Sequence, residues 1–254
     1  MKMQQKDKDT CLRSLYEELY GSLQKTGTEA HFVAMCGPEY RQSCFRFMLI
    51  GRSTNGWKSL NTESPEMFGA DAQSQFDDSG RWDSLIESSE NGVLKARDNK
   101  AYCPSIIPFW SYAGGVFENL CKLADYKPSC SHWMKNIAWS NLYKIAPGEE
   151  GNPNEELMAS QLPVCRKILQ YELEVLQPTH VLILAGYDYF KPFASVFEQC
   201  RDKGERNIMS GQHKNEVFVE GTACFGNAKV VIACRPEYRQ KDAFVEQVVR
   251  EFQS

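Results

Sequence analysis

Residues 137–186 read IAWSNLYKIAPGEEGNPNEELMASQLPVCRKILQYELEVLQPTHVLILAG, and the fold assignment begins from this segment. The apolar stretch at 137–142 predicts a buried strand, and the stretch at 180–185 predicts a second one. Between them, apolar residues recur at helical spacing from Glu155 until Pro178, which cannot continue a helix. A strand, a long helix and another strand in this order predict two parallel strands joined by a helical crossover.

The rest of the chain continues this alternation. Residues 45–50 predict a strand that Gly51 ends, and residues 217–219 and 229–233 predict two later strands. The spacing of apolar residues also predicts further helices, located by Leu12 to Leu23, Phe109 to Leu123, Phe190 to Phe197 and Phe244 to Phe252. Alternating strands and helices indicate an α/β fold in which helices cover both faces of a parallel sheet.

The composition is typical of a globular chain with one large core. The chain has 254 residues, of which 42% are hydrophobic, and no stretch reads as a linker or a repeat. We therefore expect a single domain over residues 1–254, with an N-terminal helix and a long polar insertion at about 53–108. The formal net charge of −4 gives no support for nucleic-acid binding, although it does not exclude a local basic groove.

The sequence predicts neither a membrane segment nor a metal site. Residues 1–9 are polar, which argues against a signal peptide, and no apolar stretch reaches the roughly 20 residues that span a bilayer. We expect a cytoplasmic monomer with no membrane partner. The 10 cysteines are scattered without a Cys-x-x-Cys pair, which favours reduced thiols in the core over zinc or iron–sulfur ligands. No metal and no cofactor are predicted.

Three predicted strands end in polar or aromatic residues. The first is followed by Gly51-Arg52-Ser53-Thr54-Asn55-Gly56-Trp57, the second ends in Ser140-Asn141-Leu142-Tyr143-Lys144, and the last is followed by Cys234-Arg235-Pro236-Glu237. In a parallel sheet these ends meet at one edge, where ligands bind in open α/β folds. The three segments therefore predict one shared binding crevice.

The second strand end continues into a longer motif. It comprises an Asn-x-x-Lys strand end, a Pro-containing loop, a helix with Glu and Leu, and a Pro before a strand that ends in Gly; the residues are Asn141, Lys144, Pro147, Gly151, Asn152, Pro153, Cys165, Leu169, Glu172, Leu176, Pro178 and Gly186. This motif resembles the uracil-DNA glycosylase superfamily, particularly its bacterial and archaeal iron–sulfur branch. The cluster cysteines of that branch are not matched, apart from Cys165. The resemblance implies a three-layer α/β/α sandwich around a central, mainly parallel four-stranded sheet.

The resemblance also implies roles for individual residues. The base-recognising Asn of the family matches Asn141, whose amide has the donor and acceptor that a pyrimidine edge requires. The family's first motif resembles Gly-x-Asp-Pro or Gly-x-Asn-Pro, and its acid or amide positions the attacking water. Ser53 takes that place here, and Asn55 follows two positions later. The family's last motif resembles His-Pro-Ser, and here Arg235 takes the place of the His. An arginine stabilises a departing anionic base by charge and hydrogen bonds.

Other residues of the three strand ends complete the expected pocket. Trp57 is expected to stack on a base, or to be a core or lid residue instead. The remaining pocket residues are expected to be Gly51, Arg52, Pro236 and Glu237. Some of these residues also have a simpler interpretation: Asn141 as a turn residue, and Arg235 as the partner of Glu237 or Asp188 in an ion pair. Lys144 is expected either to contact a phosphate or to be a solvated charge. Phe109 and Trp110 are expected to pack in the core and not to form a stacking platform.

The leading functional hypothesis is hydrolysis of the N-glycosidic bond to a damaged or deaminated base in DNA. The expected partner is DNA or another nucleobase-containing ligand. A second hypothesis is a non-catalytic member of the same fold that binds a nucleobase, a nucleotide or a nucleic acid, because the Asp and His of the family motifs are missing. A third is an enzyme that acts on a small nucleoside or an unrelated substrate, since a fold does not fix chemistry.

Overall fold

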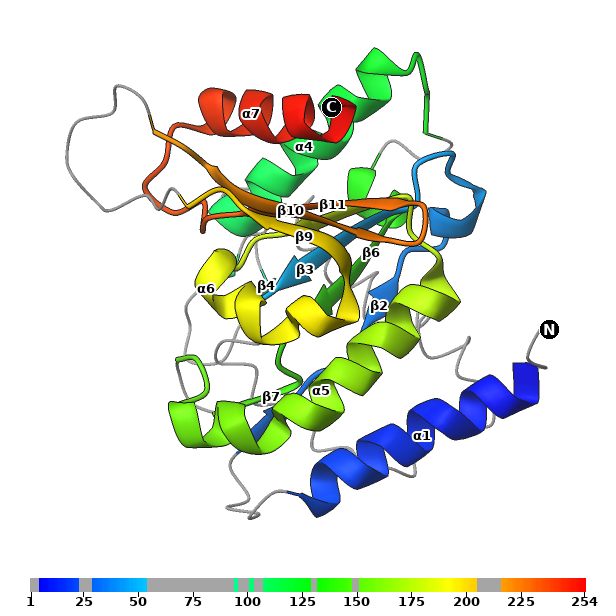
Figure 1. Cartoon of the computed structure of the whole chain (residues 1–254). Helices are drawn as coiled ribbons and strands as arrows, with labels where there is room; N and C mark the ends of the chain where they lie inside the picture. The colour runs from blue at the N-terminus through cyan, green and yellow to red at the C-terminus, as the bar shows by residue number, and fades with distance from the viewer. Residues whose placement is uncertain are drawn as a thin grey trace.

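The computed structural model describes residues 5–22, 29–53, 94–95, 101–102, 107–128, 132–147, 151–204 and 216–254. Asn55, Trp57 and most of the predicted insertion at 53–108 therefore lie outside the described residues. The fold is α/β, with a mixed sheet and helices on both of its faces (Figure 1).

The main sheet has seven strands in the order β2-β6-β3-β8-β11-β10-β9. Their bounds are Met35–Cys36 (β2), Phe47–Gly51 (β3), Ile137–Asn141 (β6), His180–Ile183 (β8), Glu198–Asp202 (β9), Val219–Phe225 (β10) and Ala228–Ala233 (β11). The central strands β6, β3, β8 and β11 are parallel to one another. The strands β2, β10 and β9 extend both edges in antiparallel fashion.

The predicted number of four strands is therefore wrong, for a physical reason. Parallel central strands are buried on both faces, so they are easily recognised as apolar stretches in the sequence. In β3, for example, every residue is buried. The edge strand β9 has the sequence EQCRD and is mostly exposed, so it lacks that pattern. The strand predicted at 217–219 begins only at Val219, and its continuation to Phe225 contains Glu220, Gly221 and Thr222.

One face of the sheet is covered by α5 (Glu155–Leu176), by α6 (Tyr187–Phe190) and by the 3-10 helix η5 (Lys191–Val196). The predicted N-terminal helix, α1 (Gln5–Gly21), packs on α5 (Figure 1). The core on this face receives alternate side chains of the central strands, among them Met48, Ile50, Val181, Ile183, Val230 and Ile232. The helix predicted from Phe190 to Phe197 is thus a short α-helix followed by a 3-10 turn.

The opposite face is covered by α4 (Pro108–Leu123) and the C-terminal α7 (Lys241–Gln253), which pack against each other (Figure 1). Their apolar faces meet the other set of alternate strand residues, among them Phe47, Leu49, Leu182, Val231 and Ala233. Because side chains alternate along a strand, successive residues of each central strand point to opposite faces of the sheet and so belong to different cores. Both predicted helices are confirmed at these positions.

The long helix α5 begins and ends where the sequence predicts. Oδ1 of Asn154 accepts a hydrogen bond from the Leu157 backbone N–H at 2.8 Å, which caps the first turn. The helix ends at Gln177, whose φ of 48° is left-handed, and Pro178 follows. Pro163 lies inside the helix without ending it.

Short elements complete the described part of the chain. They are β1 (Glu29–His31) paired with β7 (Ile145–Pro147), β4 (Leu94–Lys95) paired with β5 (Ala101–Tyr102), and the 3-10 helices η1 (Tyr40–Gln42) and η4 (Trp133–Asn136). Among the described residues, no helix is both long enough and apolar enough to cross a membrane.

Candidate functional site

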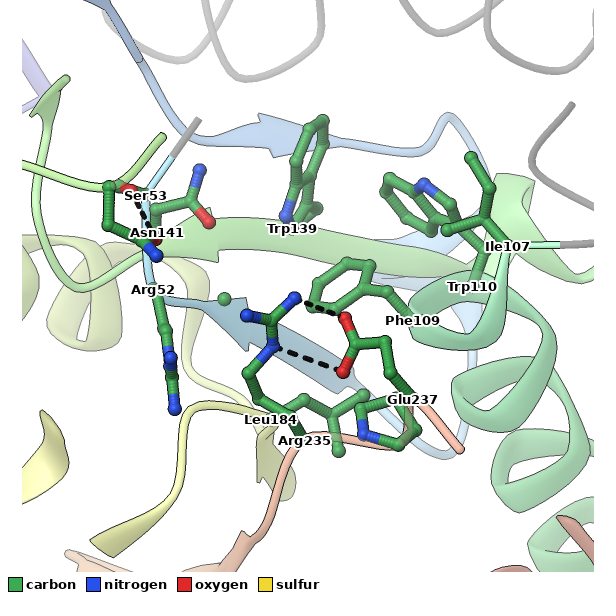
Figure 2. A pocket seen from close by; sticks show the side chains of 13 residues that line it. Arg52, Ser53, Ile107, Phe109, Trp110, Trp139, Asn141, Leu184, Arg235 and Glu237 are labelled. Carbon is green, nitrogen blue, oxygen red and sulfur yellow. Dashed lines mark hydrogen bonds and ion pairs between the residues drawn. The ribbon is translucent and has the colours of Figure 1, made fainter. Parts of the chain in front are cut away.

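The carboxyl ends of the central strands surround a pocket of about 310 Å³. All predicted site residues that fall within the described chain line it: Gly51, Arg52, Ser53, Asn141, Arg235, Pro236 and Glu237. Figure 2 shows Asn141, Ser53 and Arg52 at one side of the pocket and Ile107, Trp110 and Phe109 at the other. The structure therefore brings together the three strand ends that the sequence singled out, whereas Asn55 and Trp57 lie outside its described residues.

Asn141 is the most deeply buried polar residue of the pocket. It ends β6, is 1% exposed, and lies directly across from Gly51 in the register of β3 and β6. A Cβ atom at residue 51 would stand 2.4 Å from Asn141 Oδ1, so the amide can take this position only beside a glycine. Within the described part of the chain, Asn141 Nδ2 has no hydrogen-bond partner. Asn141 therefore lines the pocket and contains a buried donor without a partner among the described residues.

A buried ion pair holds the end of β6 from the core side. Lys144 Nζ lies 2.8 Å from both carboxylate oxygens of Glu172, and both side chains are fully buried. The same ammonium donates to Ser140 Oγ and to the backbone oxygen of Asn141, each at 2.7 Å. Both sequence interpretations of Lys144 were wrong. Its side chain is not solvated and does not line the pocket, because it forms a buried ion pair with Glu172 of α5.

Arg52 is held from two sides. Its Nε donates to the backbone oxygen of Ala185 at 2.8 Å, and its Cζ lies 4.1 Å from the centre of the Tyr189 ring. Burial, followed by the positive charge of Arg235, lowers the pKa of the Arg52 guanidinium. The side chain remains a cation because the ordinary arginine pKa lies far above neutrality.

Arg235 forms the ion pair that the sequence analysis gave as its alternative, with Glu237 and not with Asp188. Its Nε donates to Glu237 Oε2 at 3.0 Å and its Nη2 donates to Oε1. In Figure 2 the pair lies between Arg52 and Phe109. The two side chains are 46% and 32% exposed, so the pair is reached by water and contributes little to stability.

Ser53 lies beside a residue that the sequence analysis quoted but did not place in the site. Its Oγ donates to Asn152 Oδ1 at 3.3 Å, and both residues line the pocket. Asn152 belongs to the loop between β7 and α5. Its position within the Gly-Asn-Pro part of the family-like motif was the available sequence signal.

Aromatic side chains form a wall of the pocket that begins next to Asn141. Phe109 and Trp110 begin α4, and Trp139 lies two residues before Asn141 on β6. The ring centres of Trp110 and Trp139 are 4.7 Å apart, and those of Phe109 and Trp110 are 5.0 Å apart. Ile107 and Leu184 extend this apolar surface. Phe109 and Trp110 thus pack in the core, as predicted, and also line the site, which was not predicted.

The described cysteines do not fit an iron–sulfur cluster. Cys165 is fully buried, its Sγ lies 3.3 Å from Gln161 Oε1, and burial raises its pKa to about 12. Among the residues that the structure describes, no group of His, Cys, Asp and Glu is arranged to hold a metal ion.

Comparison with known proteins adds no relative, since neither a protein-family model nor a curated protein matches this chain.

Proposed function

We propose that this chain hydrolyses the N-glycosidic bond of a damaged or deaminated base in DNA, with the base bound in the pocket between Asn141 and the aromatic wall. The observation that carries the proposal is the buried Asn141 amide: its residue lines a cavity with aromatic walls, and its Nδ2 lacks a partner among the described residues. An enzyme that acts on a base has to take it out of the stack and enclose it in such a pocket.

The Asn141 amide favours one class of base. Its Oδ1 lies against Gly51, and its Nδ2 donor requires an acceptor on the ligand. Deamination replaces an exocyclic amino group, which is a donor, by a carbonyl oxygen, which is an acceptor. A base with a carbonyl at this place satisfies Nδ2, whereas an amino group would leave two donors facing each other. The pocket is thus suited to uracil, hypoxanthine or xanthine.

The proposed reaction consumes one water molecule. Ser53 and Asn152 present a hydroxyl and an amide that can orient this water, and Asn55 remains a predicted participant. The water oxygen forms a bond to C1′ of the sugar while the bond from C1′ to the base nitrogen breaks. The base leaves with the bonding electron pair and takes up a proton released by the water. Arg235 stabilises the negative charge that develops on the departing base.

The same proposal includes a three-layer architecture for the fold. The four parallel strands with helices on both faces support a three-layer α/β/α sandwich of the uracil-DNA glycosylase type, extended by additional edge strands. The partner would then be DNA. The resemblance in residues 137–186 and the meeting of the three strand ends support this assignment together.

A second candidate function is non-catalytic binding of a nucleobase or nucleotide. It is favoured by the ion pair between Arg235 and Glu237, because a guanidinium that is already neutralised by a carboxylate gives a departing anion less stabilisation. The absence of the family's Asp and His at the Ser53 and Arg235 positions supports the same candidate.

A base-release assay separates the two candidates. The protein is mixed with oligonucleotides that contain uracil, hypoxanthine or xanthine, and abasic sites are then cleaved with alkali. We expect strand cleavage with at least one base and a loss of two orders of magnitude or so in Asn141→Ala, as for other lost transition-state contacts.

The matched control is Asn227→Ala, which removes an exposed amide in the turn between β10 and β11, remote from the pocket. Unchanged cleavage in Asn141→Ala would remove that residue from the mechanism. No cleavage of any substrate, together with ligand-induced thermal stabilisation, would select the binding function.

A further inference from the structure

Two arginines face the pocket from different strand ends. Arg52 follows β3 and Arg235 follows β11, and both line the cavity. Among the described residues, the Arg52 side chain makes one hydrogen bond, from Nε to Ala185 O, and its two Nη groups make none. Its Cζ lies 4.1 Å from the centre of the Tyr189 ring, and this cation–π contact restricts the guanidinium. Arg52 therefore presents oriented N–H donors to a ligand without having to break an existing bond.

Two described carboxylates lie near the two arginines, but only Glu237 lines the cavity with them. Glu220 contributes to the electrostatics of Arg52, but it is buried, does not line the pocket, and accepts the Tyr187 backbone N–H at 2.6 Å. Glu237 is the pocket-lining carboxylate, and it pairs with Arg235. Two like charges in one partly buried site are stabilised by an anion placed between them.

We propose that Arg52 and Arg235 form a phosphate-binding subsite of the pocket, and that the Glu237 carboxylate takes the place of the phosphate in this structure. The inference rests on the proposed function only in assigning that phosphate to a nucleotide unit. A phosphate carries more negative charge than a carboxylate and binds a guanidinium through paired hydrogen bonds. Because Glu237 is one-third exposed and lies two residues from Arg235, it can turn into solvent without unfolding the chain.

The arrangement of the pocket supports a ligand with two unlike ends. Asn141 and the aromatic wall suit the base, whereas Arg52 and Arg235 provide the cationic part. A nucleotide unit has both a base and a phosphate. Glu237 would then act as an internal competitor that is displaced only by a ligand with sufficient negative charge.

The test compares 2′-deoxyuridine, its 5′-monophosphate and inorganic phosphate by titration calorimetry. We expect the monophosphate to bind about tenfold more tightly than the nucleoside, as expected for one charge-assisted interaction. Glu237→Gln should increase the affinity for the monophosphate and for inorganic phosphate severalfold, because the competing charge is removed. Arg52→Gln should abolish the difference between nucleoside and monophosphate. Arg250→Gln, which changes a 69% exposed side chain on α7, is the matched control and should leave all three affinities unchanged.

Two results would overturn the subsite: equal affinity for nucleoside and monophosphate in both the unmodified protein and Glu237→Gln, or an undiminished preference for the monophosphate in Arg52→Gln. If Arg52→Gln does not fold, Glu237→Gln decides, since it alters an exposed carboxylate. Phosphate binding without base release would retain the subsite and contradict the glycosylase proposal, and base release without phosphate binding would do the reverse.

The source of the phosphate is resolved by competition. An oligonucleotide without terminal phosphates that displaces inorganic phosphate assigns the subsite to the DNA backbone. Failure of that oligonucleotide to compete, with competition by the monophosphate, assigns it to a mononucleotide. Both outcomes support the subsite and differ only in its physiological ligand.

Discussion

At the scale of single residues, the pocket depends on one contact that a side chain would prevent. Gly51 and Asn141 are partners in the register of β3 and β6, and the Asn141 carboxamide lies over the bare Cα of the glycine. The Phe109 ring approaches the same point, 3.3 Å from where a Cβ would stand. One small residue thus allows the amide and the aromatic wall to come close to each other.

Gly51→Ala is therefore expected to displace the Asn141 amide while leaving the fold in place. Because the contacted atoms are side-chain ends that can shift, the loss in unfolding free energy should be no more than about 1–2 kcal/mol. Base release and nucleoside binding should fall at least tenfold. The control is Gly21→Ala at the end of α1, where an added Cβ meets nothing within 4 Å. Full activity in Gly51→Ala would show that the amide does not need this position.

At the scale of secondary-structure elements, the ion pair between Lys144 and Glu172 joins α5 to the strand that carries Asn141. Both charges are fully buried, and Lys144 also binds Ser140 Oγ and the Asn141 backbone oxygen. Gln161, one turn further toward the start of α5 than Cys165, accepts the backbone N–H groups of Lys144 and Ile145. The helix therefore fixes both the strand end and the segment that leaves it.

Removing one partner of the pair should be more harmful than removing both. Lys144→Met leaves an uncompensated buried carboxylate, and we expect a loss of about 3–5 kcal/mol in the free energy of unfolding. The double variant Lys144→Met with Glu172→Leu replaces the charges by apolar groups and should recover much of that loss. Urea unfolding of both single variants and the double variant measures the coupling. Additive losses would mean that the two charges do not stabilise each other.

The same elements show what the sequence can and cannot predict. The strands β3, β6 and β8 were predictable because burial on both faces gives each of them a run of apolar residues. The edge strand β9 was not, because an exposed strand needs no such pattern. The burial of Lys144 was not predictable either, since its partner lies 28 residues away on a helix whose facing side depends on packing. Seven site residues were predicted from strand ends, whereas Asn152 enters the pocket on a loop, Phe109 and Trp110 enter it on α4, and Trp139 lines it from within β6.

At the scale of the whole molecule, the end of the sheet opposite the pocket contains the half-buried His180. It lies at the start of β8, between the rings of Phe45 and Phe252 at 5.1 and 5.3 Å, and Nδ1 is 2.9 Å from Thr179 Oγ1. Burial, with a smaller contribution from the charge of Lys229, lowers the pKa of His180 to about 4. The folded protein therefore keeps this imidazole neutral where an unfolded chain would protonate it.

This difference predicts a loss of stability in acid. Because the folded pKa is below the ordinary value of 6.5, the contribution of His180 is fully present above pH 6.5 and is lost as the pH falls toward about 4. The loss should amount to roughly 2–3 kcal/mol of unfolding free energy. His180→Gln should flatten the stability profile between pH 6.5 and 4 while leaving base release at neutral pH unchanged. Parallel profiles for the two proteins would assign the acid sensitivity to other groups.

The order of the parallel strands has a consequence for how the protein is made. β3 is the first of the four to be synthesised, yet it lies between β6 and β8, both of which are translated much later. Until they emerge, an apolar strand with two open edges has to be shielded from aggregation. Arg235 and Glu237, which line the pocket, are synthesised later still, after β11. A nascent chain therefore lacks a complete pocket until the segment after β11 is synthesised, and ribosome-bound intermediates are expected to need a chaperone more than the finished protein does.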